Sequence, residues 1–320
     1  MKTFFHVNDI GDLGVALEEA LQVKATPFAW KHLGLDKTIM LVFFNSSLRT
    51  RLSSQKAALN LGMNPIVLNI GQDSWKLETE MGVVMDGDKS EHLREAIPVM
   101  TSYCDLIGIR SFAGLQDRAY DYGETVLRQF IEYGGKPVIS LESATVHPCQ
   151  AFADLITIEE YRRKKRPKVV LTWAPHPRAL PQAVPNSFAE WMRAADVDFV
   201  ITHPRGYELD PAFAGDAPVE YDQMKALEGA DFVYAKNWSC PGVTDPAQYG
   251  QILSKDMGWT VDARHMAVTN DAYFLHCLPM RRNMIVSDEV IDAPTSLVIP
   301  EAANRVVSAQ VVMKRMLESL

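Results

Sequence analysis

The sequence lacks the short motifs of several large enzyme classes, and it has no long apolar run. It contains no G-x-x-x-x-G-K-[ST] loop, no G-x-G-x-x-G after a strand, no H-E-x-x-H and no G-x-S-x-G. P-loop nucleotide hydrolysis, dinucleotide binding, zincin chemistry and serine hydrolysis therefore have no fingerprint here. No segment stays apolar over the roughly 20 residues that a membrane helix needs, so we expect no membrane partner.

Cysteine is scarce and widely scattered, without a C-x-x-C pair or a nearby His/Cys group. This spacing argues against a zinc site and predicts buried, reduced thiols, hence a cytoplasmic protein with no metal and no other cofactor. The opening MKTFFHVNDIGDLG turns polar after two phenylalanines, so we expect no signal peptide. The cysteines are Cys104, Cys149, Cys240 and Cys277.

Basic residues are outnumbered, since 32 Lys and Arg against 40 Asp and Glu give a formal net charge of −8. This balance argues against a nucleic-acid partner, which selects a net basic face. An anionic ligand must then meet cations that are clustered locally.

Short apolar runs recur along the 320 residues and alternate with segments that read as helices. Continuous apolar strands in this alternation predict parallel sheets with helices on both faces, so the fold class is α/β with two doubly wound lobes. We expect the first lobe at 1–147 and the second at 148–300, with a closing helix, 301–320, packed back on the first. The predicted strands are 38–44, 64–70, 105–111, 136–142, 168–174, 198–204, 231–238, 272–279 and 296–301.

The helices between these runs are predicted from periodicity and capping signals. Asn8 is a possible N-cap for a helix over 8–24, in which Leu13, Leu17 and Leu21 share one face. Further helices are predicted at 47–61, 147–166 and 187–196.

The stretch FFNSSLRTR predicts an anion site at the start of a helix. A strand ends at Phe44, and Ser47, Arg49 and Thr50 then meet the unpaired N–H groups of a helix N-terminus. Arg adds a forked, charge-assisted contact. The alternative is that Ser47 only caps the helix while its arginines pair with surface acids.

Two further stretches place polar groups at strand ends. In SATVHPCQAFADL, Pro148 can occupy the first turn of a helix, which brings His147 and Gln150 to its N-terminal end, although a lone histidine is more often structural. In FLHCLPMRR, Pro279 ends a strand and leaves nearby carbonyls to accept hydrogen bonds. Arg305 lies in the first turn of the closing helix.

SLRTR, HPCQ and HCLP, in this order, resemble the S-x-R-T-R, H-P-x-Q and H-C-L-P motifs of the carbamoyltransferases, the family of aspartate and ornithine transcarbamylases. The resemblance covers the whole chain. It implies a carbamoyl phosphate domain followed by an amino-acid domain, assembled as homotrimers with active sites shared between subunits. It also implies transfer without a covalent enzyme intermediate.

The resemblance assigns roles to individual residues. Arg49, Thr50 and His147 would stabilise the charge that develops during transfer, so Cys277 is expected to be positional rather than nucleophilic. The residues implied to bind carbamoyl phosphate are Ser47, Leu48, Arg49, Thr50, Trp75, Arg110, His147, Gln150, Cys277, Leu278 and Arg305.

Two departures narrow the branch of the family. The D-x-x-x-S-M-G segment of ornithine transcarbamylases is missing, and a proline-rich stretch, WAPHPRALPQAVPNSF, is present at 173–188. Both resemble the N-acylornithine branch, in which this loop helps form a knot in the second lobe, and in which Trp75 would enter a neighbouring subunit's site. The implied N-acylornithine contacts are Glu142, His176, Arg178, Lys236 and Arg281.

The acyl group is expected to be succinyl. Acetyl-specific members tend to carry a glutamate and a lysine where Ser90 and Ile285 stand here, and Arg178 or Lys236 could pair with a second carboxylate. N-acetylornithine stays the alternative acceptor because Glu91 follows Ser90 directly. If the alignment shifts by one residue, a glutamate stands at this position, and that half of the comparison favours acetyl. The remaining alternatives are a changed activity in the same fold and a non-catalytic protein that binds small molecules between two lobes.

Overall fold

The structure, a computed structural model, describes all 320 residues and divides into two compact units. The first unit comprises residues 1–113, 119–149 and 305–320, and the second comprises 114–118 and 150–304. Three helices therefore have residues in both units: α4 (Arg118–Tyr122), α6 (Pro148–Tyr161) and α12 (Val298–Leu317). Which substrate each unit binds stays a prediction.

The first unit is built on a five-stranded parallel sheet. Its spatial order is β1 (Thr3–Phe4), β7 (Val138–Glu142), β6 (Leu106–Arg110), β2 (Thr38–Phe43) and β3 (Asn64–Asn69). Most of these strands are apolar throughout because both faces of the sheet are covered. Parallel pairing brings the carboxyl ends of neighbouring strands to one edge.

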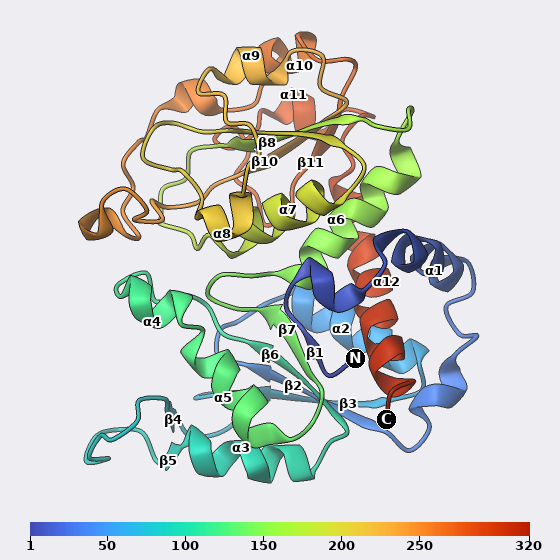
Figure 1. Ribbon diagram of the computed structural model, residues 1–320, viewed down its shortest axis with the longest axis vertical. Coiled ribbons are helices and arrows are strands. Elements are labelled where there is room, and N and C mark those ends of the chain that lie inside the picture. Colours follow the sequence, from blue (N-terminus) through green and yellow to red (C-terminus); the bar gives the residue numbers. More distant parts are fainter. The chain divides into compact units, whose positions relative to one another are not determined.

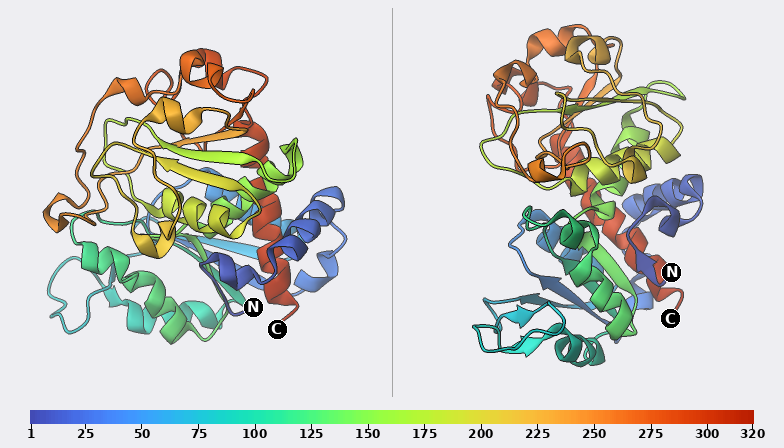
Figure 2. Two further views of the ribbon diagram at one scale, coloured as in Figure 1. Left: turned by 45° about the horizontal axis from the view of Figure 1, so that its top comes forward. Right: turned by 60° about the vertical axis from the view of Figure 1, so that its left-hand side comes forward.

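Helices cover both faces of this sheet (Figure 1, Figure 2). On one face α3 (Leu93–Ser102) and α5 (Thr125–Gly134) lie side by side, and on the other α2 (Arg49–Asn60) lies with α1 (Leu13–Ala25) and α12. The buried side chains under α3 and α5 form one cluster, which includes Met40, Val42, Leu93, Ile97, Ile107, Ile109, Leu127, Phe130 and Val138.

Several elements of the chain's first half are short. They are η1 (Val7–Ile10), η2 (Lys31–Gly34), the paired β4 (Leu77–Glu78) and β5 (Glu91–His92), and α4 (Arg118–Tyr122). Strands of two residues show no alternation, so the sequence pattern missed β1, β4 and β5.

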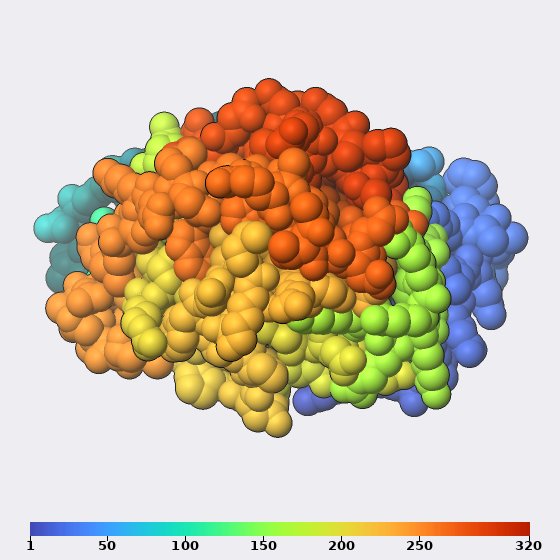
Figure 3. Space-filling view, turned by 90° about the horizontal axis from the view of Figure 1, so that it is seen from above, coloured from blue at the N-terminus to red at the C-terminus, as the bar shows by residue number.

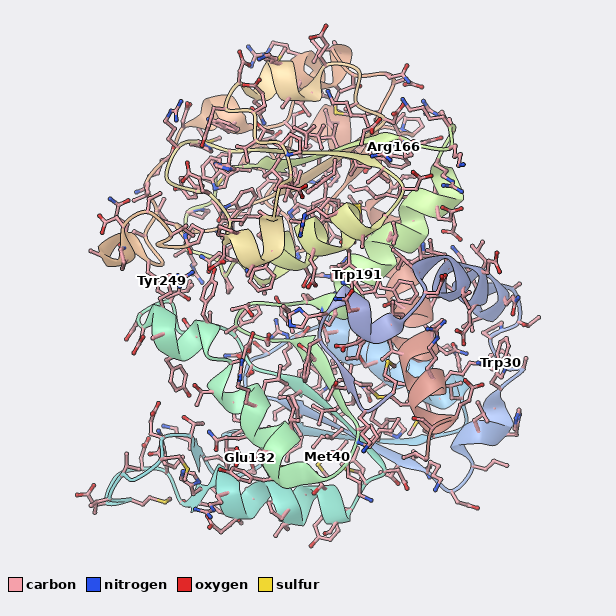
Figure 4. All side chains as sticks on the ribbon, in the orientation of Figure 1. Trp30, Met40, Glu132, Arg166, Trp191 and Tyr249 are labelled. Carbon is pink, nitrogen blue, oxygen red and sulfur yellow. The ribbon has the colours of Figure 1, made fainter.

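The second unit holds a four-stranded parallel sheet in the order β11 (Tyr273–Leu275), β10 (Phe232–Lys236), β8 (Lys168–Trp173) and β9 (Asp198–Thr202). α6 and α7 (Ala183–Ala194) cover one face. There Trp191, labelled in Figure 4, stacks on Phe152 with 5.2 Å between the ring centroids. The remaining elements are α8 (Pro211–Ala214), α9 (Gln223–Leu227), η3 (Pro246–Gln248), η4 (Met257–Trp259), α10 (Ala263–Ala267) and α11 (Asp288–Ile291).

The opposite face of the second sheet packs against α9 and α11. Val170, Val233 and Phe274 of the sheet share a buried cluster with residues of these two helices, such as Leu227 and Val290. Figure 3 shows the surface of this unit, formed by the segments drawn in yellow-orange to red.

None of the helices of this chain combines the length and the apolarity that crossing a membrane requires.

The predicted fold class is confirmed, and eight of the nine predicted strand segments contain a strand. The ninth, 296–301, is wrong, since α12 already begins at Val298. Pro300 fits its first turn because the first four N–H groups of a helix need no partner within it. The segment looked like a strand because it is apolar and short. The knot stays a prediction.

The N-terminal helix also differs from expectation. α1 begins at Leu13, and the cap is Asp12, whose carboxylate accepts a hydrogen bond from Val15 N at 2.9 Å, rather than Asn8. The buried face consists of Ala16, Ala20 and Val23, so the predicted leucine face is wrong. The run KKR at 164–166, which lies within the predicted helix 147–166, is exposed and follows the end of α6 at Tyr161.

Glu19 on α1 anchors the end of α12. Its carboxylate accepts hydrogen bonds from Lys314 Nζ and Arg315 Nε, both at 2.7 Å, and Lys314 also lies 5.4 Å from the Trp30 ring centroid. Trp30 is labelled in Figure 4. These contacts join two helices that are distant in the sequence.

We predict that Glu19→Gln lowers the free energy of unfolding by about 1–3 kcal/mol, because two partly buried cations lose their carboxylate. The matched control is Glu18→Gln on the exposed side of α1, which should change stability by less than about 0.5 kcal/mol. Denaturant unfolding compares them, and equal effects would contradict an anchoring role for Glu19.

Candidate functional site

The loop after β2 delivers a group of polar residues to the start of α2. Leu48 occupies the N-cap position of α2, and Ser47 Oγ, one residue earlier, accepts a hydrogen bond from Thr50 N at 3.3 Å. Thr50 is buried, Arg49 is half-buried, and the Leu48 side chain is exposed. Capping accounts for one N–H group and leaves the Ser47 hydroxyl hydrogen available to a ligand.

Arg110, the last residue of β6, is the centre of the neighbouring contacts. Its Nη1 donates to the carbonyls of Asn45 at 2.9 Å and Ser46 at 2.8 Å, and its Nη2 lies 3.1 Å from Glu142 Oε2. The guanidinium carbon is 4.1 Å from the centroid of the Phe112 ring. One buried cation thus ties the loop after β2 to the last residue of β7.

Arg305 reaches the same group from α12. Its Nη2 donates to Thr50 Oγ1 at 2.6 Å and lies 3.4 Å from His147 Nε2, which in turn is 3.6 Å from Glu142 Oε2. Because a guanidinium only donates, the contact with Arg305 favours a lone pair on His147 Nε2. Thr50, Arg110, Glu142, His147 and Arg305 form one buried cluster, the anion cluster.

The anion cluster carries an excess of positive charge, with two guanidiniums and one carboxylate. Burial lowers the pKa of Arg110 from its usual value; Glu142 opposes this shift, and the charge of Arg305 adds to it. The Nε atoms of Arg110 and Arg305 are buried without a hydrogen-bond acceptor. Buried donors and like charges of this kind are stabilised by an added anion.

Gln150, in the first turn of α6, belongs to the second unit. Its Nε2 donates to Asp154 Oδ1 at 2.7 Å and to Glu301 Oε1 at 3.3 Å. Two carboxylates on the same side orient the amide, so its oxygen points elsewhere. That oxygen is buried and accepts no hydrogen bond, which fits a ligand N–H group.

The end of β11 is held by hydrogen bonds to its N–H groups. His276 N donates to Glu301 Oε2, and Leu278 N donates to His276 Nδ1, both at 2.8 Å. Leu278 has φ of +52°, an uncommon conformation for leucine that often marks functional segments. Its carbonyl oxygen takes no hydrogen bond from the chain and is available to a ligand. Burial suits the positional role expected for Cys277.

A second group of cations lies at the carboxyl ends of β8 and β10 in the second unit. His176 Nε2 lies 3.3 Å from Arg281 Nε, and His176 Nδ1 lies 2.8 Å from the Arg178 carbonyl. Since Arg281 can only donate, the imidazole carries its proton on Nδ1. We name His176, Arg178, Lys236 and Arg281 the cation group.

Electrostatics keep His176 neutral. Burial lowers its pKa, and the charges of Lys236, Arg281 and Arg178 lower it further. Buried Lys236 donates to the neutral carbonyl of Asn237 at 3.1 Å. The three cations thus surround a neutral ring, an arrangement that suits ligand carboxylates.

Arg282 behaves differently from its neighbour Arg281. Arg282 pairs with Asp288 at 2.8 Å and Asp292 at 2.6 Å, and these hydrogen bonds raise its pKa. Arg282 therefore stabilises the segment around α11 through these two ion pairs. The RR pair of the sequence contains one candidate ligand and one structural residue.

The remaining sequence-predicted residues are more dispersed. Glu142, expected beside the N-acylornithine contacts, lies in the anion cluster of the first unit. Trp75 is 56% exposed and donates from Nε1 to Glu91 at 2.9 Å. Ser90 N bonds the Lys76 carbonyl, whereas Ile285 is buried in the second core.

Glu124 is a site-supporting residue that the sequence pattern missed. Its Oε1 accepts hydrogen bonds from Ser143 Oγ at 2.6 Å and from Thr145 N at 2.8 Å. It thereby holds the loop that joins Glu142 to His147. Nothing in its local sequence indicates this role, because the partners lie 19 and 21 residues away.

Comparison with known proteins identifies the family of the chain. The family description "Aspartate/ornithine carbamoyltransferase, carbamoyl-P binding domain" matches residues 2–160, and "Asp/Orn binding domain" of the same family matches 181–316. The chain belongs to this family. The predicted family is confirmed, and with it the class of enzyme, a carbamoyltransferase.

Relatives and solved structures give the nearer context. N-succinylornithine carbamoyltransferase of Bacteroides thetaiotaomicron is 68% identical over 100% of both chains. N-acetylornithine carbamoyltransferase of Xanthomonas axonopodis pv. citri is 37% identical over 94% of this chain and 93% of its own. A glutamate-to-serine mutant of N-acetyl-L-ornithine transcarbamylase, complexed with carbamyl phosphate and N-succinyl-L-norvaline, has a TM-score of 0.90 at 36% identity, covering 99% of this chain and 100% of that one.

We predict that inorganic phosphate stabilises the wild type beyond chloride at equal ionic strength, because it neutralises the excess charge of the anion cluster. A ligand at about 100 times its Kd adds roughly 2.7 kcal/mol. Arg110→Gln should lose most of this increment, and Arg282→Gln should keep it. Thermal unfolding in both salts measures the increment for each protein; an undiminished increment in Arg110→Gln would contradict the assignment.

Proposed function

We propose that this carbamoyltransferase moves the carbamoyl group of carbamoyl phosphate to the δ-amine of N-succinyl-L-ornithine, giving N-succinyl-L-citrulline and phosphate in arginine biosynthesis. The observation that carries the acceptor assignment is the cation group, in which Arg178, Lys236 and Arg281 surround neutral His176. An acceptor with two carboxylates matches that charge better than an acceptor with one.

Carbamoyl phosphate would meet donors from several elements. We assign its phosphate to Ser47, Leu48, Arg49, Thr50, Arg110 and Arg305. The excess positive charge of the anion cluster and the unpaired Nε atoms of Arg110 and Arg305 support this assignment. His147 would donate to the carbamoyl oxygen. The NH2 of the carbamoyl group would donate to Gln150 Oε1 and to the carbonyls of Cys277 and Leu278.

The chemistry needs no nucleophile from the protein. The neutral δ-amine attacks the carbamoyl carbon, a C–N bond forms, and negative charge grows on the carbonyl oxygen. The tetrahedral intermediate collapses as the C–O bond to phosphate breaks and the amine nitrogen releases a proton. Arg49, Thr50 and His147 would stabilise the oxygen and the leaving phosphate, an effect worth about 3–4 kcal/mol per donor in measured cases.

The acceptor would be held by both ends. The cation group would bind the carboxylates of the acceptor, and Glu142 would bind its δ-amino group. The contact of Glu142 with His147 supports this role, because it puts a carboxylate beside the residue assigned to the carbamoyl oxygen. A neutral His176 adds a hydrogen bond without a further charge.

Succinyl is favoured over acetyl by two comparisons. The relative that shares 68% identity is named for N-succinylornithine, whereas the relatives named for N-acetylornithine share 37–38%. In the related structure, a mutant of N-acetyl-L-ornithine transcarbamylase with serine in place of a glutamate is complexed with N-succinyl-L-norvaline. If Ser90 stands at that position, as the resemblance implies, no acid opposes the second carboxylate there. N-acetyl-L-ornithine is the alternative acceptor.

The assembly belongs to the same proposal. We infer a cytoplasmic homotrimer in which Trp75 of one subunit enters the site of its neighbour, with residues 1–147 binding carbamoyl phosphate and 148–300 the acceptor. Four free buried thiols agree with a reducing compartment. Trp75 is exposed, and so are Met81 and Val84 later in the same segment, and exposed apolar side chains suit a protein contact.

We predict turnover with N-succinyl-L-ornithine, at least about tenfold lower kcat/KM with N-acetyl-L-ornithine, and none with ornithine. Arg178→Ala should reduce this preference through KM for the succinyl substrate, whereas Arg166→Ala, whose guanidinium pairs with exposed Asp196 and Asp198, should not. Citrulline-product assays measure each acceptor. Turnover confined to ornithine would exclude the N-acylornithine assignment.

Mixing variants tests the shared site. Arg49→Ala should cut kcat by about 100-fold or more, since it removes a transition-state donor. Trp75→Ala should also be impaired. After subunit exchange, mixtures of the two should recover activity, because some hybrid sites carry neither change. Mass spectrometry confirms the exchange; exchanged but inactive mixtures would rule out a shared site.

A further inference from the structure

A pair of buried carboxyl groups lies beneath the residues assigned to the carbamoyl group, and no step of the transfer uses it. Asp154 on α6 and Glu301 on α12 both have no exposed surface. Gln150 Nε2 contacts both of them, Asp154 Oδ1 at 2.7 Å and Glu301 Oε1 at 3.3 Å. Glu301 Oε2 also accepts from His276 N at 2.8 Å. Glu301 thus contacts both Gln150 and the segment that carries Cys277 and Leu278.

We propose that Asp154 and Glu301 share one proton, and that this protonated pair is a positioning device for Gln150 and for the backbone of His276. The proposal rests on the proposed function for its catalytic consequence. The shared proton itself rests only on the geometry of the second unit.

Burial and mutual repulsion both disfavour a second negative charge on the pair, because neither carboxyl group is exposed and both contact the same amide nitrogen of Gln150. The titratable groups that face Glu301 are Asp154 from α6, Tyr234 from β10, and His276 and Cys277 after β11. His276 Nδ1 accepts from Leu278 N, so that nitrogen carries no proton. Tyr234 stays a phenol, because burial raises its pKa well above its usual value. Burial and the neighbouring Asp154 likewise raise the pKa of Glu301.

The hydrogen bonds also locate the proton. Glu301 Oε2 accepts from a backbone N–H, so the proton lies on Oε1, from which it is donated to Asp154. The shorter contact of Gln150 with Asp154 identifies Asp154 as the ionised member, because charge-assisted hydrogen bonds are shorter. A glutamine at position 301 can reproduce the contacts with Asp154 and His276, with its NH2 towards Asp154 and its oxygen towards His276 N. It loses only the longer contact at 3.3 Å, because an NH2 group cannot accept from Gln150 Nε2.

The shared proton has a consequence for stability. The folded chain keeps a proton that the unfolded chain releases near the ordinary pKa of 4.5. Since the folded state then binds more protons, stability is greatest below that pH and falls as the pH rises towards the folded pKa. Glu301→Gln removes the titrating proton and therefore this fall.

The first test is denaturant unfolding of the full chain between about pH 6 and pH 8, at fixed protein concentration. The unfolding constant of the wild type relative to that of Glu301→Gln should rise roughly tenfold per pH unit, the slope for one proton. Glu132→Gln, an exposed carboxyl on α5 labelled in Figure 4, is the matched control and should run parallel to the wild type. A ratio for Glu301→Gln that does not change with pH overturns the shared proton.

A second variant covers the case in which Glu301→Gln does not fold. Asp154→Asn removes the charge that repels Glu301 but not its burial, so it should lower the pKa of Glu301. The unfolding constant of the wild type relative to this variant should therefore rise with pH, by at most about tenfold per unit. Infrared spectroscopy gives an independent measurement, because the wild type should show the carbonyl band of a protonated carboxyl at neutral pH. Loss of that band in either variant supports the pair, and its absence from the wild type overturns it.

Kinetics test the positioning role. Glu301→Ala, which leaves Gln150 and His276 N without this acceptor, should lower kcat/KM for carbamoyl phosphate by at least about tenfold, and Glu301→Gln should restore most of the loss. Equal losses in both variants overturn positioning by the protonated form. A wild type without any carbamoyl transfer overturns the proposed function instead, while the unfolding slopes still decide the shared proton.

Discussion

The contact between Arg110 and Glu142 is the interaction on which the first unit's site depends. It joins the ends of β6 and β7, and the same guanidinium holds the carbonyls of Asn45 and Ser46 after β2. A buried charge is tolerated only when it is paired and hydrogen-bonded, so this arrangement has little freedom to change. Arg305 adds a second buried guanidinium without a second carboxylate, and this excess of positive charge is the basis of the proposed anion site.

The second unit contains two groups of ionisable side chains that differ in the sign of their charge. Beneath Gln150, two carboxyl groups are buried side by side, and burial together with their mutual repulsion favours a proton on Glu301. Around His176, cations gather beside a neutral imidazole. The first arrangement orients the Gln150 amide, and the second is the proposed site for ligand carboxylates. Both exist in a chain of formal net charge −8, so local clustering rather than net charge determines what the protein can bind.

Local pattern was sufficient for most of the fold. Eight apolar runs contain strands because each is long enough to show burial on both faces, whereas two-residue strands such as β1 carry no such pattern. The run at 296–301 has the composition of a strand, but it completes the start of a long helix whose first turn tolerates Pro300. Asn8 and Asp12 are both good caps, and only the turn ending at Gly11 places Asp12 directly before the first helical residue, Leu13.

The sequence by itself determined the α/β class, the group of polar residues at the start of α2, and the motifs SLRTR, HPCQ and HCLP that indicate the family. Each of these is a property of neighbouring residues. The tertiary structure alone decided that Glu142 contacts Arg110 and His147, that Arg281 contacts His176 while Arg282 binds acids near α11, and that Glu301 meets Asp154 and Gln150. These partners lie far apart in the chain, and the charge of each depends on burial and on neighbours that no local pattern records.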